Sequence, residues 1–175
     1  MHYLCNTMIR DTSATVAFTG HRTYRSEADA ALRRKIGELH AAGCRTFLSG
    51  MAAGFDLAAA EAVIACRSRL PDLRLVAAVP FEGHINRFSS EDQERFRRIM
   101  AAADETVVLS ERYHRGVYMV RNDYLVSRAA RVVAWFDGSP GGTRYTVLRA
   151  LKSGRQVDNL CPTGPHFPPP YPTLF

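Results

Sequence analysis

Apolar, strand-like runs alternate with helix-like segments along most of this chain, and that alternation restricts its fold more than any other feature. In the run at residues 73–81 almost every side chain is apolar, as in a strand that is covered on both faces. Strands that alternate with helices at this spacing are joined by right-handed crossovers. We therefore expect an α/β fold with a doubly wound, mainly parallel sheet and helices on both faces. The expected strands span residues 14–18, 45–48, 73–81, 106–109, 131–136 and 156–160.

The segments between these strands carry the periodicity and the end signals of helices. In the first segment, apolar side chains recur at helical spacing and Gly43 ends the helix. Ser26, with Asp29 three residues later, resembles a capping box and predicts where this helix begins. Ser89 or Ser90 is expected to cap the third helix. The expected helices span residues 26–42, 55–69, 89–103, 117–129 and 143–153.

Glycine-bearing loops follow three of the expected strands. The longest joins the fifth strand to a helix through Gly141, Gly142 and Thr143, and the loops after the first two strands contain Gly20 and Gly50. Glycines let a backbone approach an anion, and the amides that open a helix point at it. One such loop is as often a plain turn. All strands of a parallel sheet deliver their carboxyl ends to one edge, so the three loops are expected to line one crevice and to cradle a phosphate.

The length of the chain indicates a single domain. Its 175 residues suffice for one sizeable core. We expect an irregular lead-in at residues 1–13, the domain at residues 14–160 and a proline-rich tail at residues 161–175, either packed on the domain or loosely ordered. The longest apolar runs have strand length and are broken by arginine or glycine, so no membrane segment is expected. The N-terminus lacks the pattern of a secretory signal.

Cysteine usage and charge narrow the setting and the partners. The four cysteines are widely spaced, which favours reduced thiols in a cytoplasmic protein and no bound metal. The formal net charge is +6, and arginine supplies nearly all of the positive charge. Arginine suits bidentate recognition of phosphate, although a solvated surface explains the same charge. The charge thus permits a nucleotide or nucleic-acid partner without requiring one.

Four motifs occur in a fixed order along residues 14–160. They read Phe-Thr-Gly-His-Arg from Phe18, Ser-Gly-Met-Ala-Ala-Gly-Phe-Asp from Ser49, Arg-Asn at residues 121–122, and Asp-Gly-Ser-Pro-Gly-Gly-Thr from Asp137. In this order and spacing they resemble a family of bacterial proteins, the YpsA-like branch of the SLOG superfamily. Proteins of that superfamily are Rossmann-like and are inferred to bind nucleotides or nucleotide-derived ligands. The resemblance therefore implies a single Rossmann-like domain that binds such a ligand.

The same superfamily contains relatives with two different activities. The LOG phosphoribohydrolases cut the base from a nucleoside monophosphate and carry Pro-Gly-Gly-x-Gly-Thr-x-x-Glu, but in this chain Thr146 stands where that glutamate is expected. A threonine cannot carry the negative charge, so hydrolysis of this type would need another carboxylate, for which Asp56 and Glu61 are candidates. The DNA-processing protein A family binds single-stranded DNA, but the extra DNA-binding modules of those proteins are absent from this sequence.

The motifs supply candidate binding residues. We assign Gly20, Gly141, Gly142 and Thr143 to phosphate, with the Thr143 hydroxyl and amide as donors, and Arg22 to a bidentate phosphate contact. A surface salt bridge is the alternative for Arg22.

Other candidates have two readings each. His21 either bonds a base or phosphate or ties its loop. Asp56 either accepts ribose hydroxyls or stabilises the first turn of its helix. Arg121 and Asn122 face about 100° apart on one helix, so we expect only one of them to touch the ligand. The second glycine loop adds Ser49 and Gly50 to the site.

Two further loops give weaker evidence about the binding site. Residues 113–115, Tyr-His-Arg, could stack a base or form an ordinary exposed loop. Asp137 is expected to hold its turn through an Asx-type bond.

Three functions remain open on the sequence. The leading hypothesis is a protein that binds or senses a nucleotide and requires no cofactor, rather than an enzyme. The alternatives are a nucleotide hydrolase of the phosphoribohydrolase type and a single-stranded nucleic-acid binder. By analogy with the LOG relatives, a homo-oligomer is a further expectation.

Overall fold

The computed structural model describes residues 12–169 and contains one six-stranded sheet. The strand order is β4-β3-β2-β1-β5-β6, and all neighbouring strands pair in parallel. The expected α/β fold with a parallel sheet is confirmed. The strands are β1 (Thr15–Gly20), β2 (Thr46–Ser49), β3 (Arg74–Val79), β4 (Glu105–Val108), β5 (Arg131–Trp135) and β6 (Gln156–Asn159).

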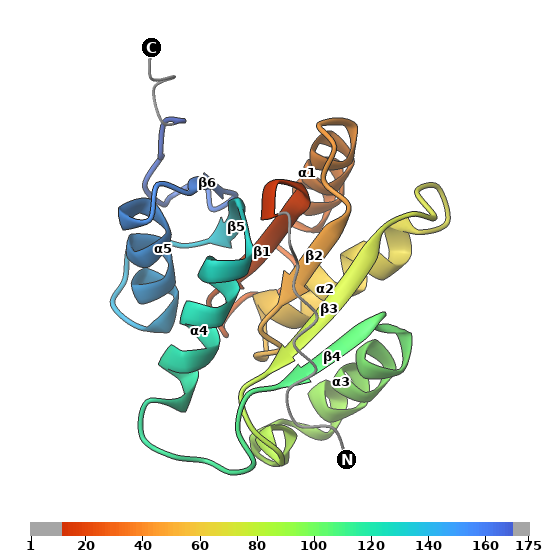
Figure 1. Cartoon of the computed structure of the whole chain (residues 1–175), viewed down its shortest axis with the longest axis vertical. Coiled ribbons are helices and arrows are strands. Elements are labelled where there is room, and N and C mark those ends of the chain that lie inside the picture. The colour runs from red at the N-terminus through yellow and green to blue at the C-terminus, as the bar shows by residue number, and fades with distance from the viewer. Residues whose placement is uncertain (1–11, 170–175) are drawn as a thin grey trace.

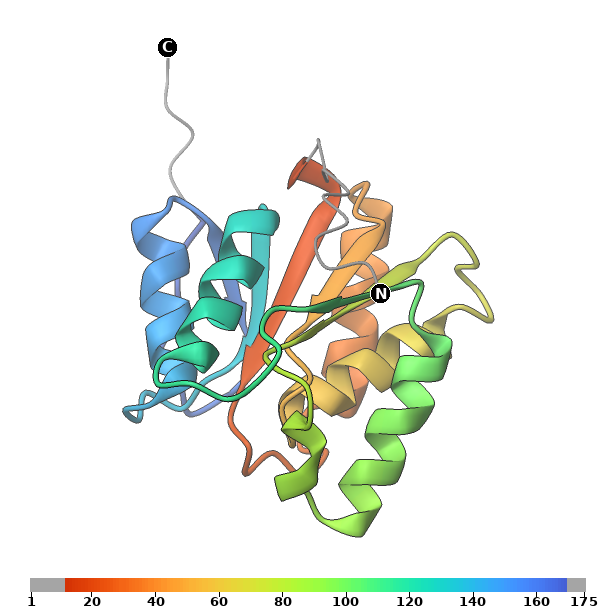
Figure 2. The same ribbon diagram turned by 60° about the horizontal axis from the view of Figure 1, so that its bottom comes forward.

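Helices cover both faces of this sheet (Figures 1 and 2). The first three pack side by side on one face, and the last two pack together on the other. This is the doubly wound, Rossmann-like arrangement that the alternation predicts. The helices are α1 (Asp29–Ala41), α2 (Phe55–Cys66), α3 (Ser90–Ala102), α4 (Val117–Arg128) and α5 (Gly142–Lys152), with short 3₁₀ turns η1 (Thr12–Ala14) and η2 (His84–Arg87).

The central strands are buried on both faces because their side chains alternate between two cores. In β1, Val16 and Phe18 join the core under α1, α2 and α3, whereas Ala17 joins the core under α4 and α5. Phe18 lies against Phe47 of β2, with ring centroids 5.7 Å apart. A continuous apolar run is what a strand between two helical layers requires.

The predicted capping box at the start of α1 is wrong. Ser26 has a φ of 73°, and α1 begins only at Asp29, without a cap from the Ser26 side chain. The hydroxyl of Tyr24 instead accepts a hydrogen bond from the amide of Ala28, the residue before the helix, at 3.0 Å and donates one to Asp29 Oδ1 at 2.6 Å. The Ser-x-x-Asp pattern does not include Tyr24, so the pattern could not predict these bonds.

The cap predicted for α3 is present. The Ser89 hydroxyl accepts a hydrogen bond from the Asp92 amide at 3.1 Å. The first turn also contains Glu91, so two carboxylates stand at the positive end of the helix.

The order of the strands creates a topological switch point beside β1. The chain adds β2, β3 and β4 on one side of β1, and α4 then carries it back to β5 on the other side. The loops that leave β1 and β5 therefore run to helices on opposite faces of the sheet (Figure 2). In open α/β sheets, ligands bind in the crevice outside the carboxyl ends of the strands at such a point.

The described part of the proline-rich tail packs on the domain. Asn159 Nδ2 donates to the carbonyl of Phe136 at 2.8 Å and to that of Pro165 at 2.9 Å. A Cβ on Gly164 would lie 1.9 Å from the Phe136 oxygen, so the chain can pass here only with a glycine. Phe167 packs against the core under α4 and α5. The Pro-Pro-Pro-Tyr stretch continues past residue 169, outside the described residues.

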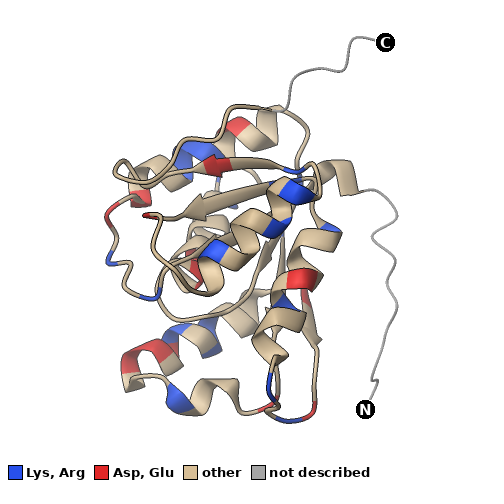
Figure 3. Ribbon diagram, turned by 90° about the vertical axis from the view of Figure 1, so that its left-hand side faces the viewer, with Lys and Arg blue, Asp and Glu red and all other residues tan. Residues whose placement is uncertain are grey.

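Within residues 12–169 no helix is long and apolar enough to span a membrane. Basic and acidic residues are interspersed over the helices rather than segregated, as the side view in Figure 3 shows. That distribution is typical of a solvated surface.

Candidate functional site

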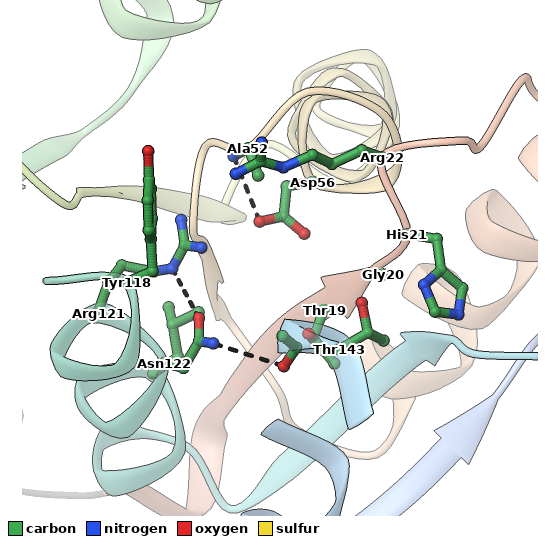
Figure 4. Close-up of a pocket in the computed structure, with 12 residues that line it drawn as sticks. Thr19, Gly20, His21, Arg22, Ala52, Asp56, Tyr118, Arg121, Asn122 and Thr143 are labelled. Carbon is green, nitrogen blue, oxygen red and sulfur yellow. Dashed lines mark hydrogen bonds between the residues drawn. The ribbon is translucent and has the colours of Figure 1, made fainter. Parts of the chain in front are cut away.

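A cavity of about 330 Å³ opens at the switch point. Its walls come from the loops after β1 and β2, from the N-termini of α2 and α5, and from the side of α4 (Figure 4). The expected convergence of the three glycine loops on one crevice is thus found. The lining residues are Thr19, Gly20, His21, Arg22, Ala52, Asp56, Tyr118, Arg121, Asn122, Leu125, Gly142 and Thr143.

Asp56 is the most unusual side chain of this cavity. Only 4 % of the residue is exposed, and its Oδ1 has no hydrogen-bond partner among the described residues. Its Oδ2 accepts one long bond, from the Ala52 amide at 3.4 Å. Burial raises the pKa of Asp56 from 3.8 to about 6, against the opposing effects of the Arg121 guanidinium and of the backbone amides of Ala52 and Gly20. A buried carboxylate with an unused oxygen is available to accept a donor from a ligand.

Arg121 lies beside this carboxylate and is itself buried. Its guanidinium donates from Nη1 to the Gly50 carbonyl and from Nε to Asn122 Oδ1, the latter at 2.8 Å. Both Arg121 and Asn122 line the cavity, and Arg121 also braces the β2–α2 loop through the Gly50 carbonyl, so the prediction that only one of them touches the ligand stays a prediction. The two residues point in different directions from the helix axis, but the long Arg121 side chain bends toward Asn122 and bonds it.

Gly50 and Ser49 support the site from behind. A Cβ on Gly50 would lie 2.8 Å from Asp56 Oδ2 and 2.9 Å from Arg121 Cδ, so a glycine is needed where these two side chains meet. The buried Ser49 hydroxyl accepts from the Met51 amide at 3.2 Å and donates to the Asp56 carbonyl at 2.9 Å. Neither residue lines the cavity, although both determine how the β2–α2 loop presents Asp56.

Gly20 lines the cavity, but packing alone already requires a glycine there. A Cβ at this position would lie 2.4 Å from Phe55 Cβ, at the start of α2. The Phe55 amide also donates to the His21 carbonyl at 3.3 Å. The first glycine motif therefore joins the β1–α1 loop to the N-terminus of α2, whatever its part in binding a ligand.

The N-terminus of α5 opens into the cavity without a side-chain cap among the described residues. Gly141, at the N-cap, is exposed with a φ of 139°, and Gly142 and Thr143 form the first turn. The amides of a first turn have no partner within the helix, so they are free to bind an anion. Thr146, at the position of the LOG glutamate, is buried and its hydroxyl donates to the Gly142 carbonyl at 3.0 Å.

His21 joins two of the loops. Its Nε2 lies 2.8 Å from Asp137 Oδ1, and the Asp137 amide donates toward the same nitrogen at 3.3 Å. Asp137 also accepts from the Ser139 amide at 2.9 Å, which is the expected Asx-type bond. Hydrogen bonds to Ser139, more than the His21 contact, hold the pKa of Asp137 below its usual range. His21 thus ties the first loop to the fifth-strand loop, one of its two predicted roles.

Tyr118 lines the cavity and was not among the residues that the motifs single out. Its ring lies 5.6 Å from the guanidinium carbon of Arg22 and 5.9 Å from that of Arg121. The signal in the sequence was its spacing, since Tyr118 stands three and four residues before Arg121 and Asn122 and therefore shares their side of α4.

Glu61 does not reach the cavity. It lies five residues beyond Asp56 on α2, which turns it about 140° away. Its two carboxylate oxygens instead accept from Arg95 of α3, at 2.9 and 2.7 Å. Of the two candidate catalytic carboxylates, the structure brings only Asp56 to the cavity.

Known proteins resemble this chain in sequence and in fold. The uncharacterized SPbeta prophage-derived protein YoqJ of Bacillus subtilis is 27% identical over 130 residues, 66% of this chain and 76% of YoqJ. DNA processing protein A of Streptococcus pneumoniae superposes with a TM-score of 0.61 at 21% identity, over 83% of this chain and 49% of that one. The Helicobacter pylori protein of the same name gives 0.61 at 19%, over 83% and 64%.

This chain spans half to two thirds of those DNA-processing proteins, and identities this low indicate a shared fold alone. The family evidence is broader. A family model described as the YspA SLOG family matches residues 16–160, which include all four motifs and every strand except the first residue of β1. The chain therefore belongs to the YspA SLOG family, as the motifs predict.

Proposed function

We propose that the cleft at the switch point binds a nucleotide or nucleotide-derived ligand, with a phosphate at the N-terminus of α5. The observation that carries the proposal is the meeting of two unsatisfied features in one cavity. These are the uncapped first turn at Gly142 and Thr143, which favours an anion, and the buried Asp56 Oδ1, which needs a donor. A phosphorylated ribose has both an anionic group and hydroxyl donors.

The charges around the cavity also favour an anion. Arg22 and Arg121 contribute two positive charges, and Asp56 is the one carboxylate among the described lining residues. Even with Asp56 ionised, these three side chains leave a charge of +1. Arg22 has no carboxylate within salt-bridge distance in the part of the chain that the structure describes, so its positive charge is available to an anionic ligand.

Calorimetric titration tests this proposal. Nucleoside monophosphates with each of the four common bases, the corresponding nucleosides and inorganic phosphate are titrated into the protein, and the same samples are analysed for products. We expect at least one monophosphate to bind and its nucleoside to bind markedly more weakly. Failure of every monophosphate to bind, or equal affinity for a monophosphate and its nucleoside, would refute the phosphate site.

A single-stranded nucleic acid is the second candidate, favoured by an exposed aromatic loop. Tyr113 is 53% exposed, and the Arg87 guanidinium carbon lies 5.6 Å from its ring. Aromatic rings beside arginines are the usual platform for unpaired bases. The solved Helicobacter pylori neighbour is described with a single-stranded DNA binding mode. Salt-dependent binding of an oligonucleotide that survives saturation with mononucleotide would favour this candidate.

A further inference from the structure

The ring of Tyr118 forms an aromatic wall at one end of the cleft. Figure 4 shows Arg22 reaching from the β1–α1 loop toward this ring and toward Arg121. The two guanidinium carbons lie 5.6 and 5.9 Å from the ring centroid. Tyr118 is thus a half-buried aromatic surface with positive charge over its ring, inside a cavity whose other lining groups are mainly small or polar.

Other aromatic side chains hold this ring from outside the cleft. Phe81, His84 and Tyr113 contact it with centroid distances of 6.0, 5.8 and 6.3 Å. His84 is buried, and its Nε2 lies 3.2 Å from the Met51 carbonyl, which anchors the cluster to the β2–α2 loop. Burial lowers the pKa of His84 to about 4, so the imidazole is neutral at physiological pH. These contacts fix the orientation of the Tyr118 ring beside the cavity.

The contacts between side chains give the order of groups along the α4 wall. Asn122 Nδ2 lies 3.5 Å from the Gly142 carbonyl, and Asn122 is bonded to Arg121, whose guanidinium lies near Tyr118. Asp56 lies in the middle, beside Arg121. Four residues of helix separate Asn122 from Tyr118, about 6 Å along the axis. The sequence of groups is therefore helix N-terminus, then carboxylate, then aromatic ring.

We propose that Tyr118 is the base-stacking surface of the site, so that the ligand is a nucleotide with its phosphate at Gly142 and Thr143, its ribose at Asp56 and its base against Tyr118. This order matches the order of phosphate, sugar and base in a 5′-nucleotide. Arg22, whose guanidinium carbon lies 5.6 Å from the centroid of the same ring, stands at the base end of the cleft and contacts the base by a cation–π interaction. The inference rests on the proposed nucleotide function and specifies which part of the ligand meets which wall.

The experiment compares two probes, adenosine 5′-monophosphate and ribose 5-phosphate, which share everything but the base. Both are titrated into the unaltered protein and into Tyr118→Leu. Stacking of a base on an aromatic ring supports a roughly tenfold to hundredfold difference in dissociation constant between the probes. We expect that difference in the unaltered protein and its loss in Tyr118→Leu, while affinity for ribose 5-phosphate changes little.

Two further variants control for folding and for ring chemistry. Tyr118→Phe keeps the ring and is expected to keep the preference for the nucleotide. Tyr124→Leu is the matched control, because Tyr124 lies on the same helix under Arg128, at 5.2 Å, but outside the cavity lining. Thermal unfolding of each variant verifies that it is folded.

The outcomes separate the two proposals. If neither probe binds and no other nucleotide binds, the nucleotide function and the stacking surface both fail. If adenosine 5′-monophosphate binds but a folded Tyr118→Leu loses no more of its preference than Tyr124→Leu, the function stands and the stacking surface is wrong. If the unaltered protein binds both probes with equal affinity, the stacking surface is likewise wrong.

Discussion

At the scale of single residues, Asp56 carries a cost that the fold alone does not explain. The carboxylate is buried in the first turn of α2, where a position near a helix N-terminus favours it, yet burial dominates and raises its pKa to about 6. The carboxylate has an unused oxygen facing a cavity. An ionisable group that destabilises the fold and faces a cavity is typical of a functional position.

The first prediction concerns the stability of Asp56→Asn. Folding raises the pKa of this acid from 3.8 to about 6, so ionisation opposes folding above pH 3.8, and the full penalty is present above pH 6. The penalty is on the order of 3 kcal/mol. Asp56→Asn should therefore unfold with a larger free energy than the unaltered protein at pH 7.5, with little gain at pH 4.

Urea denaturation at both pH values checks this prediction. Comparing the two proteins at each pH cancels the effects of other titrating groups, including His84. A gain of the same size at pH 4 and pH 7.5 would contradict a buried, ionised carboxylate at this position.

The second residue-scale prediction concerns turnover. Thr146 occupies the position of the LOG glutamate, and its hydroxyl is bonded to the Gly142 carbonyl. Glu61 is paired with Arg95 outside the cleft, which leaves Asp56 as the one carboxylate at hand in the described lining. We expect nucleoside monophosphates to bind without substantial release of free base, as measured by chromatography. Rapid base release that Asp56→Asn abolishes would identify an enzyme instead.

At the scale of elements, the sequence predicted the strands and helices well because the central strands are covered on both faces. Residues buried on both faces read as continuous apolar runs, and Gly43 marks the end of α1. The predicted start of α1 was wrong because Ser26 has a φ of 73° and because the Tyr24 hydroxyl, outside the Ser-x-x-Asp pattern, bonds Ala28 and Asp29.

Most of the candidate site was also predictable from the sequence. Eight of the candidate binding residues line the cavity because parallel strands end at one edge. Tyr118 was missed because its place depends on α4 crossing the sheet beside the β1–α1 loop. Glu61 was included although helix geometry turns it away from Asp56.

An element-scale prediction follows for the first turn of α5. In Gly142→Val the new side chain lies next to the amides that are proposed to bind phosphate, and the Cβ meets nothing closer than Asn122 Nδ2 at 3.7 Å. We expect loss of nucleotide affinity by at least tenfold with little change in fold. Gly37→Val is the matched control, because Gly37 is also helical and its Cβ has nothing within 4 Å.

Calorimetry measures the affinity of both variants, and circular dichroism verifies their folding. If Gly142→Val binds as tightly as Gly37→Val, the first turn of α5 does not hold the phosphate.

At the scale of the whole molecule, the order of the strands in the sheet brings the residues of the candidate site together. Because β1 stands between β2 and β5, the loops after all three strands meet at one edge, and α4 crosses back over the sheet to close the side. Residues from position 19 to position 143 thus line one cavity. The DNA-processing proteins share this fold in longer chains, and a shared fold does not by itself identify a ligand.

The central claim is that a phosphate of a nucleotide-type ligand binds at the switch point. The most direct test is a crystal structure of the protein with adenosine 5′-monophosphate, or with the tightest monophosphate from the calorimetric panel. The account predicts the phosphate within hydrogen-bond distance of the Gly142 and Thr143 amides and a ribose hydroxyl at Asp56 Oδ1. A ligand bound elsewhere on the molecule, with this cavity filled by water alone, would contradict it.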